Sequence, residues 1–195
     1  MYYKLKKGYR RCLVIIGLKR GTVKLLPYDS QWKKEYDNEK ELLNFTIGKY
    51  ILDIQHIGST SIEGLWAKPI IDIAVGVESL DLVTEIKSLL EDIGYEYRGN
   101  AGVEGRVFFT KGKEELRTHY LHIIVFNGYI WRNQINFRDY LRVHKEYIDE
   151  YSNLKEKLEA KFSEDRGSYT KKKSEFINMI LKKATNVDKL RDSSL

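Results

Sequence analysis

HIGSTSIEGLWAKPIIDIAVGV, residues 56–77, is the stretch that decides the fold. Gly58 and Ser59 form a turn that precedes a predicted strand over residues 69–77. The β-branched residues of this strand fall on both of its faces, which is typical of a central strand covered on both sides. The strand carries a single acidic residue, Asp72, and a buried carboxylate is costly unless a cation or hydrogen-bond donors compensate it. Asp72 is therefore the first candidate for chemistry.

The remaining periodicity predicts helices and short strands on both sides of the central strand. Apolar residues recur at helical spacing in four segments, residues 30–46, 79–94, about 131–162, and from about 168 onward. Further strands are expected at residues 50–57, 107–110 and 118–126, and the last two form a hairpin. This order of elements indicates an α+β fold with a mixed sheet, flanking helices and a C-terminal helical pair.

The basic charge of the chain gathers at its start. The net charge is +6, yet residues 1–24 hold eight basic residues and no acidic one, which leaves the remainder close to neutral. We therefore divide the chain into a basic extension at 1–22, one domain at 23–184 and a disordered tail at 185–195. The extension could be an edge strand, a disordered arm or a segment foreign to the domain. A basic arm attracts phosphate irrespective of sequence, so we expect no nucleic-acid partner for the domain itself.

Cysteine content and hydropathy indicate the cytoplasm. The single cysteine, Cys12, excludes an internal disulfide framework and a multi-cysteine metal site, as suits a reducing compartment. The apolar run at residues 12–18 has no signal-peptide cleavage pattern, and Lys19 and Arg20 follow it at once. No stretch approaches the roughly 20 apolar residues of a membrane span. We expect a cytoplasmic protein without a membrane partner.

The Gly-Ser turn is a candidate phosphate-binding site. A glycine lets a ligand approach the backbone closely, and the hydroxyls of Ser59, Thr60 and Ser61 could donate hydrogen bonds to phosphate oxygens. Lys68 could reach the same phosphate. The alternative is a plain turn and helix cap, and Asp72 could likewise be a structural acid paired with Lys68 or an arginine.

These motifs also carry a family resemblance. A Gly-Ser turn followed after about ten residues by an aspartate on a central strand resembles the signature of the nucleotidyltransferase superfamily, which has the polymerase-β-like fold. More closely, HIGSTS together with GL.AKPIIDI resembles the GrpB (glutamate-rich protein B) family of that superfamily. The resemblance covers about residues 23–182 and includes VKLLPYDSQW, THYLHIIVF, FRDYLRVHKEYIDEY and SYTKKKSEFI.

The resemblance implies a nucleotidyltransferase, which transfers a nucleoside monophosphate with the help of carboxylates that hold two divalent ions. Gly58 and Ser59 would then contact the nucleotide phosphates, and Asp72 would bind Mg²⁺ or Mn²⁺. The sequence departs from this pattern, because Ala74 stands where a second acid is usual and the strand at 118–126 has no third acid. Both a catalytic and a non-catalytic protein are therefore compatible with the sequence.

Histidines could replace the missing acids. His119 and His122 lie three residues apart, so they face opposite sides of a strand, and we expect His122 to face Asp72. With His56, which precedes the turn, these side chains would offer one divalent ion mixed oxygen and nitrogen ligands. We therefore name Asp72 and His122 as candidate catalytic residues, and Asp72, His122 and His56 as candidate metal ligands. The alternative is that each histidine is a hydrogen-bonded core residue.

Basic residues on the predicted C-terminal helices could complete the site. Arg138 and Arg142 stand at i, i+4 and could clamp an anion bidentately. They could instead lie on a solvated face, paired with Asp139 or Glu146. Further candidates are Tyr169 and Lys173 at helical spacing, and Arg106 and Glu104 in the glycine-rich segment 99–106, which is expected to be a mobile loop.

Three hypotheses of function follow. The first is a nucleotidyltransferase-like enzyme that binds a nucleotide or another phosphorylated small molecule, with one divalent metal, in a cleft beside Gly58, Ser59 and Asp72. The alternative is a non-catalytic module on the same fold that senses a nucleotide or a coenzyme A-type ligand, because GrpB-like domains also occur fused to dephospho-coenzyme A kinase. The third and weakest is nucleic-acid binding through the basic arm at residues 1–22.

Overall fold

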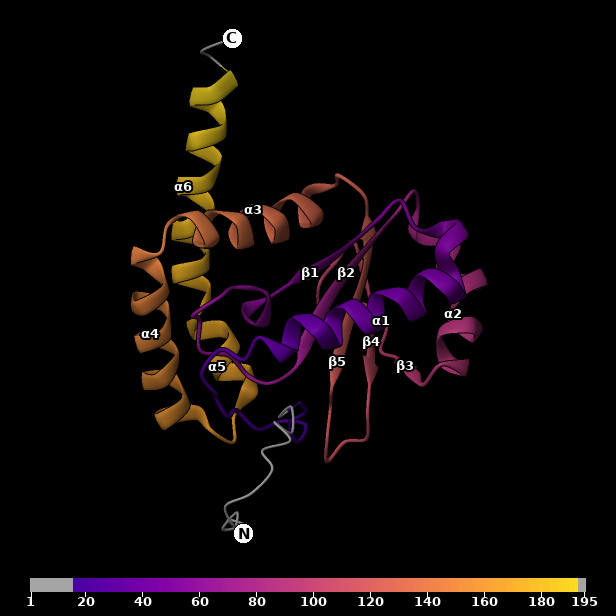
Figure 1. Cartoon of the computed structure of the whole chain (residues 1–195), viewed down its shortest axis with the longest axis horizontal. Helices are drawn as coiled ribbons and strands as arrows, with labels where there is room; N and C mark the ends of the chain where they lie inside the picture. The colour runs from indigo at the N-terminus through magenta and orange to yellow at the C-terminus, as the bar shows by residue number, and fades with distance from the viewer. Residues whose placement is uncertain (1–15, 193–195) are drawn as a thin grey trace.

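A mixed five-stranded sheet forms the centre of the molecule (Figure 1). The computed structural model describes residues 16–192. The strands are β1 (Asp53–Ile57), β2 (Ile71–Val77), β3 (Tyr95–Tyr97), β4 (Arg106–Lys111) and β5 (His119–Val125). Their order is β1-β2-β5-β4-β3, and β2 and β5 are parallel while the other neighbours are antiparallel. The expected α+β class, the mixed sheet and the interior position of β2 are confirmed.

One face of the sheet packs against α1 (Gln31–Ile47) and α2 (Val83–Asp92). Alternation along β2 turns Ile71, Ile73 and Val75 to this face, where they are fully buried in one core with Trp32 and Ile86. Burial of each such side chain stabilises the fold by roughly 1.5–3 kcal/mol. Because a slip of one residue would expose this whole set, the core fixes the register of β2 and thereby the direction of the side chains that alternate with it.

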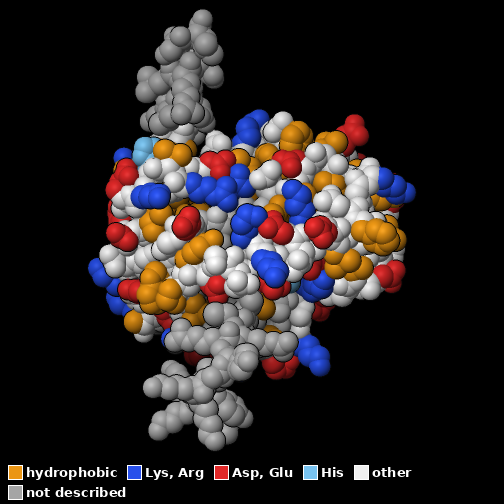
Figure 2. All heavy atoms as spheres, viewed as in Figure 1, with side chains coloured by type: hydrophobic (Ala, Val, Ile, Leu, Met, Phe, Trp, Pro, Cys, Tyr) orange, Lys and Arg blue, Asp and Glu red, His pale blue; other side chains and the backbone are white. Residues whose placement is uncertain are grey.

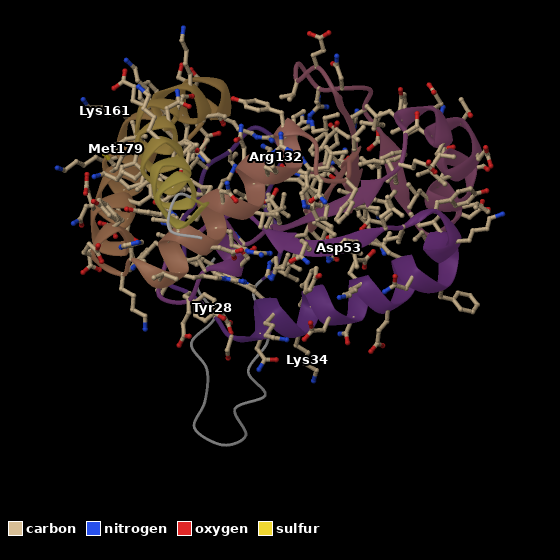
Figure 3. All side chains as sticks on the ribbon, turned by 90° about the horizontal axis from the view of Figure 1, so that it is seen from above. Tyr28, Lys34, Asp53, Arg132, Lys161 and Met179 are labelled. Carbon is tan, nitrogen blue, oxygen red and sulfur yellow. The ribbon has the colours of Figure 1, made fainter. Side chains whose placement is uncertain are left out.

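The opposite face of the sheet is covered by the C-terminal helices. α3 (Tyr129–Val143) contributes Trp131, which packs in a small buried cluster with Ile57 and Ala74. α4 (Glu146–Phe162), α5 (Arg166–Lys172) and α6 (Ser174–Asp192) gather at one side of the sheet, away from α2 (Figure 1). The view from above shows α1 and α6 on different sides of the molecule (Figure 3). The face that carries Asp72 therefore looks toward these C-terminal helices.

Each of the two helices expected in the C-terminal part is interrupted once. His144 has non-helical backbone angles (φ −101°, ψ 76°) and separates α3 from α4. Lys173 stands between α5 and α6, although its own backbone angles (φ −76°, ψ −18°) are helical. Residues 185–195 were expected to form a disordered tail, but α6 continues through Asp192, because this stretch contains no proline or glycine that would break a helix. Residues 193–195 lie outside the described part of the chain.

A strap formed by residues 16–26 joins distant parts of the domain. Its backbone pairs are Gly17 with Pro69, Leu18 with Arg117, Val23 with Ser163, and Leu26 with Ala67. The strap thus contacts the loop before β2, the β4–β5 hairpin and the end of α4. The described part of the predicted basic extension, residues 16–22, belongs to it, whereas residues 1–15, with Cys12, lie outside the described part.

The visible surface carries charges of both signs. On the face shown in Figure 2, Lys and Arg side chains are interspersed with Asp and Glu side chains rather than gathered in one basic band. This pattern agrees with the nearly neutral composition of the chain beyond its first 24 residues. Among the helices of residues 16–192, none combines the length and the apolar character needed to cross a membrane.

Candidate functional site

A cavity of about 320 Å³ opens between the sheet and helices α3–α6. Its floor is formed by the end of β1 and the beginnings of β2 and β5, and its walls by the Gly-Ser turn and the four helices. Among the described residues that line it, Asp72 is the one carboxylate, whereas Lys68, Lys155, Arg166 and Lys173 are basic. A concave site with such an excess of positive charge attracts anions.

Gly58 turns the chain sharply at the end of β1. Its backbone angles (φ 68°, ψ −174°) lie in a region that is almost restricted to glycine, and a Cβ at this position would lie 2.5 Å from Asp72 Oδ2. Ser61 Oγ closes the turn by donating a hydrogen bond to the Gly58 carbonyl at 2.6 Å. Ser59 and Thr60 line the cavity. The structure thus brings Gly58, Ser59, Thr60 and Asp72 together.

His122 also faces Asp72, with its Nε2 atom 3.5 Å from Asp72 Oδ1. The parallel pairing of β2 and β5 sets His122 beside Ala74, two residues beyond Asp72 on the same face, and the small alanine leaves room for the imidazole. Arg106 Nη1 lies 3.3 Å from His122 Nδ1, and a guanidinium can donate to this nitrogen when the imidazole proton is on Nε2, which itself has no hydrogen-bond partner among the described residues. His119 faces the other side of the sheet.

Three lysines from separate segments converge on the cavity, and we call them the cavity lysines. Lys68 precedes β2, Lys155 lies on α4, and Lys173 joins α5 to α6. Lys155 Nζ donates a hydrogen bond to Ser59 Oγ at 3.3 Å, and the Nζ atoms of Lys68 and Lys173 lie 5.7 and 4.8 Å from the centre of the Tyr169 ring. Burial, reinforced by neighbouring positive charges, lowers the pKa of Lys68 to about 7, that of Lys173 to about 8, and that of Lys155 well below its ordinary value. A shared counter-ion would relieve this repulsion.

Two basic residues of the cavity were not expected from the sequence. Lys155 is 1% exposed and lies on the apolar stripe of α4, four residues after Tyr151 and three before Leu158. A lysine at a core position of an amphipathic helix is the signal that could have marked it. Arg166 begins α5, and no feature of its spacing distinguishes it from the other basic residues of the C-terminal part. The structure also places Tyr169, named above, in the cavity wall.

His56 does not join Asp72, so the expected three-residue metal site is wrong. Ile57 is the β1 residue that pairs with Asp72, and alternation therefore turns His56 to the opposite face of the sheet. The His56 ring stacks on Tyr36 at 4.7 Å, and its Nε2 atom lies 3.0 Å from Thr60 Oγ1. Burial lowers the pKa of His56 to about 3 and keeps the ring neutral. His56 is the hydrogen-bonded core histidine of the alternative hypothesis.

Arg138 and Arg142 do not reach the cavity beside Asp72, contrary to the expectation of an anion clamp there. Arg138 pairs with Asp139 at 2.7 Å, as in the alternative considered above, and Arg142 donates to the Ser61 carbonyl at 2.8 Å. Both arginines line a second cavity, of about 520 Å³, on the other side of the Gly-Ser turn. The helical face that carries the two arginines lies against β1 and the turn. Their side chains therefore contact the turn on the side away from the cavity beside Asp72.

The side chains at Asp72 do not form a metal site by themselves. Over the residues that the structure describes, no three His, Cys, Asp or Glu side chains lie close enough together to hold an ion. Asp72 and His122 would supply two ligands at most, and Lys68, Lys173 and Arg106 place positive charge near the carboxylate. Mg²⁺ and Mn²⁺ prefer a larger set of oxygen ligands, which a phosphorylated ligand would have to contribute.

Comparison with known proteins places this arrangement in one family. The family described as "GrpB protein" matches residues 22–183. Glutamate-rich protein GrpB of Alkalihalophilus pseudofirmus is 40% identical over 171 residues, which cover 86% of this chain and 98% of that protein. The crystal structure of the conserved protein GrpB from Enterococcus faecalis superimposes with a TM-score of 0.77 at 34% identity, over 83% of this chain and 96% of that chain.

Two further matches are partial. A segment of 79 residues, 39% of this chain and 19% of the other protein, is 37% identical to dephospho-CoA kinase of Mycobacterium bovis. The structure of Cid1 in complex with the UTP analog UMPNPP gives a TM-score of 0.45 at 12% identity, over 66% of this chain and 40% of that chain.

Proposed function

The chain belongs to the GrpB family, and on that premise we propose that it binds a nucleotide or another phosphorylated small molecule in the cavity beside Gly58, Ser59 and Asp72. One observation carries the proposal: the cavity lysines and Arg166 surround the Gly-Ser turn, and a single carboxylate opposes them among the described lining residues. A di- or triphosphate chain offers several anionic oxygens, which these basic groups could share. Such a ligand would add negative charge to a cavity in which Asp72 is the one described carboxylate near the lysines.

The reaction we propose for this cavity is transfer of a nucleoside monophosphate. An acceptor oxygen would attack the α-phosphorus, the bond to the bridging oxygen would break, and pyrophosphate would leave with the displaced electron pair. The cavity lysines would hold the leaving phosphates, and Asp72, with His122 Nε2 3.5 Å away, would take the proton of the acceptor hydroxyl. Asp72 and His122 would hold Mg²⁺ or Mn²⁺ only with the help of phosphate oxygens of the ligand, and such an ion would neutralise phosphate charge.

The second candidate is a non-catalytic module that binds the same class of ligand. Ala74, in place of a second acid, and the incomplete metal ligand set favour it. Release of pyrophosphate from nucleoside triphosphates, measured over a wide panel of acceptors, separates the two candidates. Binding without any release favours the module. The partial match to a dephospho-CoA kinase makes a coenzyme A-type ligand a useful member of the binding panel.

A nucleoside triphosphate should raise the melting temperature of the protein even in EDTA, because side-chain charges attract its phosphates and a ligand of the folded state stabilises it. Lys173→Gln removes one ammonium group from the cavity and should remove most of the shift. Lys172→Gln, at the exposed lysine just before it, is the matched control and should keep the shift. Absence of a shift with every nucleotide, or an equal loss in both variants, would contradict the proposal.

Asp72→Asn should tighten triphosphate binding in EDTA roughly tenfold, because it removes the one carboxylate that repels phosphate in the cavity. Calorimetric titration near pH 6.5 is suitable, since Lys68 and Lys173 are then mostly protonated. Glu164→Gln makes the same charge change at an exposed site and should leave the affinity unchanged. If the protein is an enzyme, Asp72→Asn should also lose the release of pyrophosphate. Weaker binding in Asp72→Asn would show that the carboxylate holds the ligand instead of repelling it.

A further inference from the structure

A second groove, of about 720 Å³, adjoins the first cavity. Tyr120, Arg166 and Thr170 line both, so the two spaces share one wall. The groove lies between the glycine-rich loop before β4, the strands β4 and β5, and α5. None of the described residues that line it is acidic, and six are basic: Arg20, Arg98, Arg106, Arg117, Arg166 and Lys171. We call it the arginine groove.

Half of the basic side chains of the arginine groove already have carboxylate partners. The ion pairs are Arg117 with Glu96 at 2.8 Å, Arg98 with Glu96 at 2.6 Å, and Arg20 with Glu114 at 2.5 Å. Arg106, Arg166 and Lys171, by contrast, form no ion pair with any residue that the structure describes. The Nε atom of Arg106 is also buried without a hydrogen-bond partner, which is costly unless a ligand satisfies it. The positive charges of these three side chains are therefore not neutralised by a described carboxylate within ion-pair distance, although Arg106 already donates to His122 and to the glycine-rich loop.

Aromatic rings hold the two unpaired arginines in place. The Arg106 guanidinium lies 4.7 Å from the centre of the Phe108 ring, and that of Arg166 lies 4.9 Å from the centre of the Tyr120 ring. The two rings contact each other with their centres 5.3 Å apart. Arg106 Nη2 also donates to the Asn100 carbonyl at 2.9 Å, which ties the glycine-rich loop to the groove. The guanidinium groups are therefore positioned before any ligand arrives, and binding costs less conformational entropy.

We propose that the arginine groove binds a second substrate, an organic phosphomonoester whose phosphate contacts Arg106, Arg166 and Lys171. A phosphate dianion matches two guanidinium groups and an ammonium group better than a single carboxylate does. Val103 and Phe108 offer apolar surface to the organic part of the molecule. The inference rests on the proposed function: a hydroxyl on the organic part of this second substrate would be the acceptor that attacks the α-phosphorus, near Tyr120, Arg166 and Thr170, where the two spaces adjoin.

The test uses the full chain saturated with inorganic tripolyphosphate, which fills the first cavity, and then titrated with phenyl phosphate in a calorimeter. Phenyl phosphate should bind with one molecule per chain and should not displace the tripolyphosphate. Lys171→Glu should weaken this binding about tenfold, because it replaces an attractive charge by a repulsive one. Lys172→Glu makes the same change one residue further on, outside the groove, and should leave the affinity as it is.

Each of the other outcomes contradicts either the second site in the arginine groove or the function proposed for the first cavity. Competition between phenyl phosphate and tripolyphosphate, or equal weakening by Lys171→Glu and Lys172→Glu, would overturn the second site. Tripolyphosphate binding without any phenyl phosphate binding would also overturn it and would leave the proposed function intact. In another outcome, tripolyphosphate fails to bind while phenyl phosphate binds in a way that depends on Lys171. This result would contradict the function proposed for the first cavity but would support an anion site in the arginine groove.

Discussion

Gly58→Ala is expected to destabilise the protein by about 2–4 kcal/mol and to abolish triphosphate binding. The methyl group would lie 2.5 Å from Asp72 Oδ2 and 3.0 Å from Asp72 Cβ, so either the turn or β2 must move. The backbone angles of Gly58 add strain for any residue that has a Cβ. Urea unfolding of the ligand-free protein measures the first effect, and calorimetric titration with a nucleoside triphosphate measures the second.

The matched control is Gly64→Ala in the same loop. Gly64 also has a positive φ, 82°, but the nearest atom to an added Cβ would be Ile148 Cγ2 at 3.8 Å, an ordinary contact. This variant should lose only about 1 kcal/mol, from backbone strain, and should still bind the ligand. Equal losses of stability in the two variants, with binding kept in both, would show that the contact between Gly58 and Asp72 does not shape the cavity.

Lys68→Met should make the ligand-free protein more stable near pH 7, on the order of 2 kcal/mol, and should weaken triphosphate binding strongly. Burial and the nearby Lys173 and Arg166 disfavour the ammonium form of Lys68. Methionine fills a similar volume without the charge, whereas the bound phosphate loses one of its cations. Lys34→Met, at an exposed lysine on the outer side of α1 (Figure 3), should change neither property.

The pH dependence gives a separate check on Lys68. Its pKa is about 7 in the folded protein and 10.5 ordinarily, so over this window the unfolded chain binds more protons than the folded one. The free energy of unfolding of the parent protein should therefore rise with pH from about 7 to 10, and the advantage of Lys68→Met should shrink. Triphosphate affinity should fall over the same range, because the cavity lysines lose their charge. A constant difference between the two proteins at all pH values would mean that Lys68 keeps an ordinary pKa.

The part of the site that could be predicted from the sequence is the part built by neighbouring residues. The turn at Gly58 and Ser59 depends on local backbone preference, and the exposure of Asp72 to the cavity follows from strict alternation along β2. Even the approach of His122 to Asp72 needs only the pairing of two predicted strands. His56 could not be placed by alternation alone, because its face depends on the register that pairs its neighbour Ile57 with Asp72.

The remaining residues depend on how helices pack, which their spacing does not determine. Arg138 and Arg142 share a helical face as expected, but the position of α3 points that face at β1 and the turn. The apolar stripe of α4 could have marked Lys155 as unusual, but only the docking of α4 places it beside Ser59. Arg166 reaches the cavity because a cap and a short helix follow α4. Such placements require tertiary contacts, so a local pattern can mark a residue without giving its partners.

The strap at residues 16–26 has a consequence for the order of folding. Its backbone partners Pro69, Arg117 and Ser163 lie far from it along the chain, and contacts of this kind form late because a large loop must close before they contribute any stability. The hairpin of β4 and β5, by comparison, joins neighbouring segments. Docking of the strap ties Ala67 and Pro69, the neighbours of Lys68, to Ser163 at the end of α4, the helix that carries Lys155. The spacing of these two cavity lysines therefore depends in part on a loop that closes late in folding.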